Sequence, residues 1–276
     1  MLDMIKVIIL GLVEGITEWL PISSTGHLIL FEEFFTPKTV SDNYMTMFRV
    51  VIQLGAILAV VVLYFQTLNP FTRKKNQKQK TETWQLWIKI VVATIPAMLF
   101  GLALDDFLDA HFYNPLVIAI TLILYGIAFI YIERHPKTVR INSGAALTWQ
   151  FAFLIGCFQV LALIPGTSRS GATILGALIL GCARPVAAQF SFFLAIPVMF
   201  GASALKLVKF LASNGIGFGE FFLLLLGMVV SFFVSLYAIR FLMNYVKRHD
   251  FTKFGFYRIG LGVLVLIVFG FMGALI

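Results

Sequence analysis

The sequence predicts an all-α polytopic membrane protein with six full transmembrane helices and two re-entrant pairs of broken helices. Composition is the first reason: the 276 residues are 60% hydrophobic and 12% charged, about half the charged fraction of a soluble chain, and the mean hydropathy is +0.94. Apolar runs of about 20 residues, the length that crosses a hydrocarbon core, recur along the chain. Two further apolar segments are interrupted by Pro, Gly, Ser and Thr. No segment is polar enough for a soluble domain, so we expect one membrane domain over 1–276.

The first half opens with an apolar segment at 4–20 that stops at Pro21, and the apolar piece that follows at 27–35 is too short to span. Non-helical backbone at membrane depth is tolerated only where protein or a water-filled cavity shelters it. We therefore expect a re-entrant pair of half-helices around this break. Three segments long enough for one crossing each come next: Tyr44–Phe65, Gln85–Leu104 and Pro115–Ile132.

The second half repeats this plan. An apolar segment at 147–164 breaks at P-G-T-S-R-S-G, a short piece runs from Ala172 to Gly181, and three spans follow, at Val186–Val208, Glu220–Met243 and Phe256–Ile276. Sliding the chain by 145 residues pairs Gly11 with Gly156, Glu14 with Gln159 and Ser23 with Ser168. The sequence thus predicts a duplication, with repeats at about 1–135 and 146–276.

Loop charges predict that the repeats are inverted. Residues 66–84 carry five Lys and Arg, whereas 105–114 carry Asp105, Asp106 and Asp109 without Lys or Arg. By the positive-inside rule the first loop is cytoplasmic and the second is outside. Counting crossings between the basic loops makes the first broken pair enter from outside and the second from inside. Inverted repeats with broken helices place a binding site where the breaks meet near the midplane, so we expect Glu14 and Arg169 to face each other.

The net charge of +8 is accounted for by these short basic loops, which set orientation and contact anionic headgroups. No basic groove with interleaved aromatics is visible, so we expect membrane lipids and not nucleic acid as partners. Cys157 and Cys182 match no metal or redox spacing and are interpreted as packing residues. The first 20 residues lack a basic leader region and a cleavage site, so we expect them in the mature protein.

Ionisable and hydroxyl groups concentrate at the two breaks, which read E-G-I-T-E-W-L-P-I-S-S-T-G-H at 14–27 and P-G-T-S-R-S-G-A-T at 165–173. A charged group near the centre of a membrane helix costs about 2.5 to 3.5 kcal/mol, so it needs a function. A helix that restarts after a turn offers free N–H groups and a positive dipole end, which bind anions. Arg169 adds a fork of donors suited to phosphate oxygens. These features predict a buried phosphate site that also contains Ser23, Ser24, Thr25, Ser168, Ser170 and Thr173, although tight helix packing explains any single small residue equally well.

Glu14 and Glu18 are one helical turn apart on one face. Two carboxylates this close repel each other unless a cation is near, and Mg²⁺ is commonly held by one or two carboxylates plus phosphate oxygens. The alternative is that one glutamate is protonated and bonded to backbone while the other reaches the membrane surface. His27 alone would be a packed histidine, but beside three hydroxyls it is a candidate general acid/base or nucleophile.

Arg49 and Gln53 lie one turn apart on the next span. They are candidates for lining the cavity or binding a headgroup, and a helix-end anchor or an interhelical hydrogen bond explains them equally well. Other charged residues near predicted span ends need no explanation beyond extending their head groups to the surface: Glu32, Glu33, Lys89 and Arg240.

Five segments carry a resemblance to a known family: E-G-I-T-E and L-P-I-S-S-T-G-H within 14–27, V-I-Q-L-G-A-I-L-A-V-V at 51–61, G-C-F-Q-V-L-A-L-I-P-G-T-S-R-S-G-A-T at 156–173, and F-S-F-F-L-A-I-P at 190–197. They resemble the bacterial undecaprenyl-diphosphate phosphatases of the bacitracin-resistance type over nearly the whole chain. The resemblance implies a multi-pass enzyme of the bacterial cytoplasmic (inner) membrane that removes the terminal phosphate of a C55 polyprenyl diphosphate and regenerates the lipid carrier for cell-wall synthesis. It also implies a divalent cation, Mg²⁺ or Ca²⁺, and a site open to the outer, periplasmic face.

The resemblance further assigns roles at both breaks: Glu14 and Glu18 as the acidic motif, His27 as catalytic, Ser24 and Thr25 as active-site hydroxyls, and Ser168 with Arg169 as phosphate-binding. The attacking group stays open among Ser24, His27 and a water activated by His27 or Glu18. A transporter or flippase of a polyprenyl phosphate or another anion would share this architecture, but it has no need of the glutamate pair beside His27. A structural scaffold would leave the ionisable cluster unexplained. The sequence leaves the oligomeric state open, a homodimer included.

Overall fold

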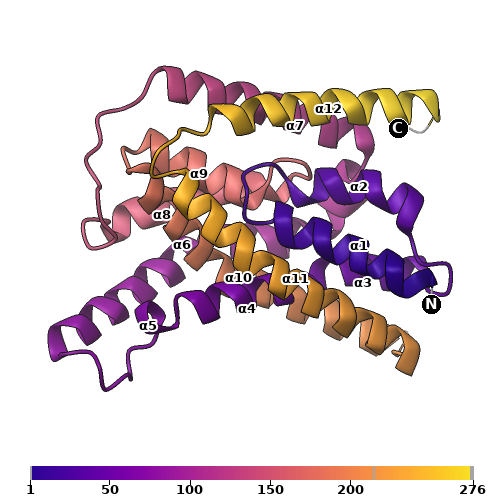
Figure 1. Cartoon of the computed structure of the whole chain (residues 1–276), viewed down its shortest axis with the longest axis horizontal. Helices are drawn as coiled ribbons and strands as arrows, with labels where there is room; N and C mark the ends of the chain where they lie inside the picture. Colours follow the sequence, from indigo (N-terminus) through magenta and orange to yellow (C-terminus); the bar gives the residue numbers. More distant parts are fainter. Residues whose placement is uncertain (1, 214, 274–276) are drawn as a thin grey trace.

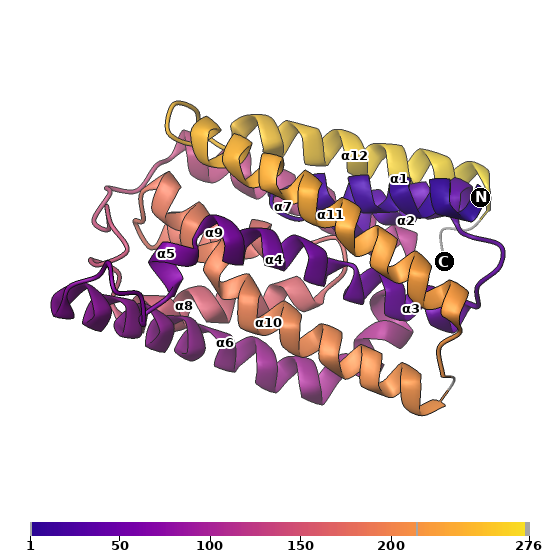
Figure 2. The same cartoon turned by 60° about the horizontal axis from the view of Figure 1, so that its bottom comes forward.

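The computed structural model is an all-α bundle of long helices packed side by side (Figures 1 and 2). It describes residues 2–213 and 215–273, and of Asp105, Asp106 and Asp109 it describes the backbone alone. The helices in chain order are α1 (Leu2–Thr17), α2 (Ser24–Phe35), α3 (Asp42–Val51), α4 (Gln53–Leu63), α5 (Phe65–Leu68), α6 (Gln77–Phe112), α7 (Pro115–Arg134), α8 (Trp149–Val160), a 3₁₀ turn (Leu161–Leu163), α9 (Arg169–Ile179), α10 (Arg184–Ser213), α11 (Phe218–Tyr245) and α12 (Thr252–Phe271).

Within the described residues, six helical stretches are long and apolar enough to cross a membrane. This result confirms the predicted polytopic all-α fold. The six stretches are Asp42–Leu63, Gln77–Leu104, Pro115–Arg134, Arg184–Ser213, Phe218–Tyr245 and Thr252–Phe271. The two predicted broken pairs are also present, as α1 with α2 and as α8 with α9.

The second predicted span lies within a longer helix, because α6 runs for 36 residues. It takes up the last part of the predicted loop 66–84 and most of the predicted loop 105–114. The early start has a local cause: the Asn76 side chain accepts from the Gln79 N–H, and the Gln79 side chain accepts from the Asn76 N–H. This reciprocal capping box starts a helix within polar sequence, and the Lys, Gln and Glu residues that follow favour its continuation.

The span predicted at Tyr44–Phe65 is present but divided, since Ile52 separates α3 from α4. The predicted final span begins earlier than expected, at Thr252, and its last residues, 274–276, lie outside the described part of the chain. The other predicted spans agree with the helices to within a few residues.

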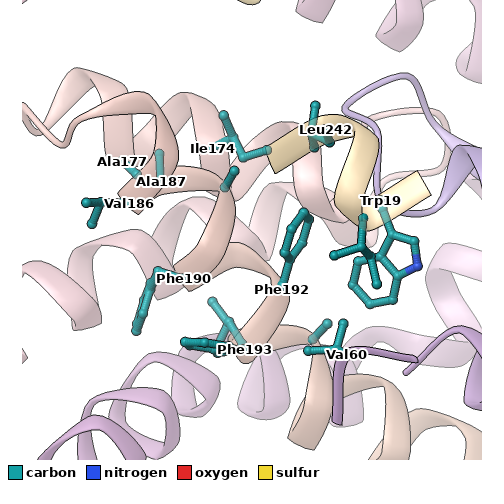
Figure 3. Packing of buried hydrophobic residues seen from close by; sticks show 14 of the residues in the cluster. Trp19, Val60, Ile174, Ala177, Val186, Ala187, Phe190, Phe192, Phe193 and Leu242 are labelled. Carbon is teal, nitrogen blue, oxygen red and sulfur yellow. The ribbon is translucent and has the colours of Figure 1, made fainter. Parts of the chain in front are cut away.

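The largest cluster of buried apolar side chains lies beside the first break. Trp19, which follows the end of α1, is fully buried, and its ring meets the ring of Phe192 edge-on with 5.2 Å between centroids. Figure 3 shows this pair together with Phe193 and Val60, so α10 and α4 both contribute to the packing. The core therefore fixes the first break against α10, on which Ser191 stands next to Phe192.

The first helix of each broken pair packs along one long helix. α1 packs along α11, and α8 packs along α6. Both crossings use a glycine at the same repeat position: a Cβ at Gly11 would lie 2.9 Å from the Gly227 carbonyl oxygen, and a Cβ at Gly156 would overlap the Ala93 carbonyl. These equivalences support a duplication, and the inverted orientation of the two halves stays a prediction.

Candidate active site

The two breaks have the same backbone geometry. Ser23 (φ 72°) and Ser168 (φ 71°) are the only non-glycine residues with positive φ in the described chain. Each caps the helix that restarts after it: Ser23 Oγ accepts from the Gly26 N–H at 3.2 Å, and Ser168 Oγ accepts from the Gly171 N–H at 3.1 Å. The two serines are 145 residues apart, which is the register found by sliding the sequence. A serine in this conformation costs about 1 to 3 kcal/mol, and such strain is concentrated at functional sites.

The breaks also touch each other. The Ser170 hydroxyl lies 3.1 Å from the Glu18 carbonyl oxygen and 3.3 Å from that of Leu20. Ser170 belongs to the first turn of α9, whereas Glu18 and Leu20 lie in the connection from α1 to α2. Both connections lie near the middle of the bundle (Figure 1). The positive ends of α2 and α9 are thus brought to one place.

A fully buried arginine that the sequence interpretation missed holds the breaks together. Arg258 on α12 has no exposed surface. Its Nη1 donates to the Pro21 carbonyl at 3.1 Å, and its Nη2 donates to the carbonyls of Gly166 and Thr167, both at 2.9 Å. One guanidinium therefore binds the backbone of both breaks. The sequence feature that could have identified Arg258 is a lone arginine inside an apolar span, because a charge there without partners costs free energy.

An ion pair lies where the breaks meet. Arg169 Nη2 is 2.9 Å from Glu18 Oε1, and Arg169 Nη1 donates to the Ser191 carbonyl at 2.7 Å. The other Glu18 oxygen, Oε2, accepts from the Ser24 hydroxyl at 2.8 Å. The guanidinium also lies over the Trp19 ring, 5.5 Å from its centroid. Acid, guanidinium and hydroxyl from both halves thus form one connected group.

The ion-pair partner of Arg169 is Glu18 and not Glu14, although Glu14 lies near enough to Arg169 for an electrostatic interaction. α1 ends at Thr17, so Glu18 stands in the break itself, while Glu14 remains inside the helix one turn earlier. Glu14 is fully buried, and neither carboxylate oxygen has a hydrogen-bond partner among the described residues. Gln159, its counterpart in the second half, is likewise buried with an unpartnered side chain.

The acidic pair could hold a divalent cation through only one of its two carboxylates. Both Glu18 oxygens already have hydrogen-bond partners, whereas neither Glu14 oxygen has one in the described part of the chain. In the part of the chain that the structure describes, no three His, Cys, Asp or Glu side chains group as a complete metal site. The protein would therefore supply one carboxylate, that of Glu14. Phosphate oxygens of a substrate would supply other ligands, an arrangement that Mg²⁺ accepts.

His27 lies in the first turn of α2 and is 6% exposed. Its Nδ1 is 2.7 Å from the Ser23 carbonyl oxygen, and its Nε2 is 2.7 Å from the hydroxyl of Tyr257 on α12. Because a carbonyl can only accept, the proton of a neutral imidazole belongs on Nδ1. Tyr257, like Arg258, was not singled out by the sequence.

Comparison with known proteins agrees with this geometry. The family model of the bacitracin resistance protein BacA matches residues 7–264. An undecaprenyl-diphosphatase of Enterococcus faecalis is 59% identical over 264 residues, covering 95% of each chain. One from Streptococcus mutans is 58% identical and covers 99% of this chain and 98% of its own, and one from Acetivibrio thermocellus is 58% identical and covers 98% of both. The chain belongs to the BacA family.

In this BacA-family protein the remaining predicted hydroxyls take several positions around the ion pair. Thr173 is buried, donates to the Arg169 carbonyl at 2.9 Å and lies 2.7 Å from the Ser191 hydroxyl. Thr25 is half-buried in the first turn of α2. Ser191 completes this group of hydroxyls. The sequence feature that could have identified it is its position within the F-S-F-F segment that carries the family resemblance. The structure thus brings the phosphate-site candidates of both breaks together.

Arg49, considered for lining the cavity or for an interhelical bond, has its ion-pair partner on a neighbouring helix. It forms a bidentate ion pair with Glu32, with Nε 2.8 and 2.7 Å from the two oxygens, and its guanidinium lies over the Tyr113 ring. It thereby joins α3 to α2, which accords with the interhelical alternative. Glu32 is buried in this pair and does not extend to the surface. Gln53 begins α4 and is partly exposed.

We expect Arg258→Met to lower the free energy of unfolding by about 3 kcal/mol, because three carbonyls at the breaks lose a charged donor and a buried unpaired carbonyl is costly. The measurement is thermal unfolding of the detergent-purified protein. Arg240→Met on α11 is the matched control, since Arg240 is exposed. Equal unfolding temperatures for the two variants would contradict the role given to Arg258.

Proposed function

We propose that this protein hydrolyses undecaprenyl diphosphate to undecaprenyl phosphate and inorganic phosphate, and so recycles the lipid carrier of cell-wall synthesis. The observation that carries the proposal is the Glu18–Arg169 ion pair at the meeting point of two helix N-termini. A catalytic acid–base group and an anion-binding group share this place. Relatives that cover nearly the whole chain at 58–59% identity bear the name undecaprenyl-diphosphatase.

Phosphoryl transfer needs chiefly positioning of the phosphate and stabilisation of its charge. The free N–H groups in the first turns of α2 and α9 provide donors, and the helix dipoles favour an anion there. Arg169 adds a permanent positive charge, and its Nε has no partner among the described residues. A diphosphate bound here would meet donors from both halves of the protein.

Ser24 is the attacking group that the geometry favours. Its hydroxyl donates to Glu18 at 2.8 Å, the hydrogen bond expected between a nucleophile and its base. In this route the Ser24 oxygen bonds to the terminal phosphorus, its proton passes to Glu18, and undecaprenyl phosphate leaves. Water then releases the phosphate from serine. A phosphorylated protein trapped by acid quenching would support this route, and its absence in single turnover would favour direct attack by water.

A divalent cation, Mg²⁺ or Ca²⁺, would be held by Glu14, and it would supply charge neutralisation of the diphosphate oxygens. Multiple membrane spans are present, and we assign them to the bacterial cytoplasmic membrane with the site open to the periplasmic face. The support for this orientation is the contrast between the basic segment 66–84 and the acidic segment 105–114.

The deciding experiment uses the purified protein in detergent with a soluble short-chain prenyl diphosphate. We expect release of inorganic phosphate that a chelator abolishes and that added Mg²⁺ or Ca²⁺ restores. Detergent removes the two compartments that transport requires, so a transporter would release no phosphate under these conditions. Phosphate release that persists in excess chelator would contradict the cation while leaving the phosphatase activity in place.

A further inference from the structure

The contact between His27 and Tyr257 connects the buried site to the outside of the bundle. The tyrosine oxygen lies 2.7 Å from His27 Nε2, and the two rings are nearly parallel, at 10° with 5.6 Å between centroids. His27 is 6% exposed, whereas Tyr257 is 50% exposed. The next residue on α12, Arg258, binds the backbone of both breaks. The hydrogen bond and the ring stacking with His27 set the phenol against the imidazole.

The hydrogen bonds of His27 use both ring nitrogens. A neutral imidazole has one N–H and one lone pair. The Ser23 carbonyl takes the N–H at Nδ1, so the lone pair is at Nε2, and it accepts from the Tyr257 hydroxyl. A proton that comes from a water or from a hydroxyl in the site therefore cannot reach Nε2 directly while this contact is present.

We propose that Tyr257 is a positioning residue that acts through His27 and relays protons to it during hydrolysis. The proposal rests on the proposed phosphatase function. As the water that releases the phosphate from serine gives a proton to the Tyr257 oxygen, the phenol proton passes to Nε2, which leaves a neutral tyrosine and an imidazolium. The reverse transfer returns the proton to a leaving oxygen. One O–H and one N–H bond form, two O–H bonds break in total, and both residues end the cycle as they began.

The test is Tyr257→Phe, which keeps the ring and removes the hydroxyl. We expect kcat to fall by about 100-fold, the low end of the usual contribution of acid–base catalysis. KM should stay within about twofold, because the diphosphate contacts are made by other groups. Tyr131→Phe is the matched control: Tyr131 also lies beside a histidine, His135, with 4.6 Å between ring centroids, but in the last turn of α7. A kcat within about twofold of the unsubstituted protein for Tyr257→Phe would overturn the proposal.

A second measurement tests the contact between His27 and Tyr257 independently of the proposed function. In ¹⁵N spectra of histidine-labelled protein, Tyr257→Phe should shift the Nε2 signal of His27 and leave its Nδ1 signal unchanged, since the Ser23 contact remains. Signals of His111, His135 and His249 should not move. An unchanged Nε2 signal would overturn the proposal whether or not the protein releases phosphate. A protein that shows the shift but releases no phosphate would refute the phosphatase function alone.

Discussion

Replacing Arg169 by lysine is expected to lower kcat/KM by about 100-fold or more, the loss typical of removing a preorganised donor at a developing charge. The Arg169 guanidinium binds Glu18 and the Ser191 carbonyl at once and also lies over the Trp19 ring. An ammonium group is a point charge that cannot reproduce the planar fork. The measurement is phosphate release by the detergent-purified variant at several substrate concentrations.

Arg184→Lys is the matched control for this substitution. Arg184 also forms a bidentate pair, with Glu133, at the start of α10, away from either break. We expect Arg184→Lys to retain most of its activity. Near-normal turnover by Arg169→Lys would place Arg169 outside the substrate contacts, and failure of the variant to insert into the membrane would show that its main role is packing.

The positions of the breaks could be predicted because local sequence determines them. Pro21 followed by a Ser-, Thr- and Gly-rich turn ends a helix, unlike a lone proline such as Pro96 inside α6, and self-similarity at 145 residues anticipated that Ser23 and Ser168 would be equivalent. The charge of Arg169 inside an apolar segment was enough to indicate a buried acidic partner. Local rules therefore gave the fold class and most of the site.

What the sequence could not give were contacts that depend on distant helices. Tyr257 meets His27 across 230 residues, and Arg258 meets Pro21 across 237. Neighbouring side chains in an apolar helix do not show which of them faces the protein interior. Whether Glu14 or Glu18 pairs with Arg169 depends on where α1 ends, because Glu18 stands in the break only if the helix stops before it. Helix ends are set by tertiary contacts as well as by local sequence.

We expect Glu14→Gln to abolish activity without destabilising the protein. Phosphate release should fall by about 100-fold or more if this carboxylate binds the cation at the diphosphate. The unfolding temperature should stay equal or rise, because a buried carboxylate without partners is itself unfavourable. Gln159 shows that a glutamine is accommodated in the equivalent surroundings of the second half.

Glu18→Gln is the comparison that makes this result interpretable. It weakens the buried pair with Arg169, and removing one partner of such a pair costs about 3 to 5 kcal/mol, so both activity and unfolding temperature should fall. Mg²⁺ added together with inorganic diphosphate should raise the unfolding temperature of the unsubstituted protein and not that of Glu14→Gln, since a ligand stabilises only the state that binds it. If Glu14→Gln lost as much stability as Glu18→Gln, Glu14 would have a structural partner, and its free oxygens could no longer be explained by a cation.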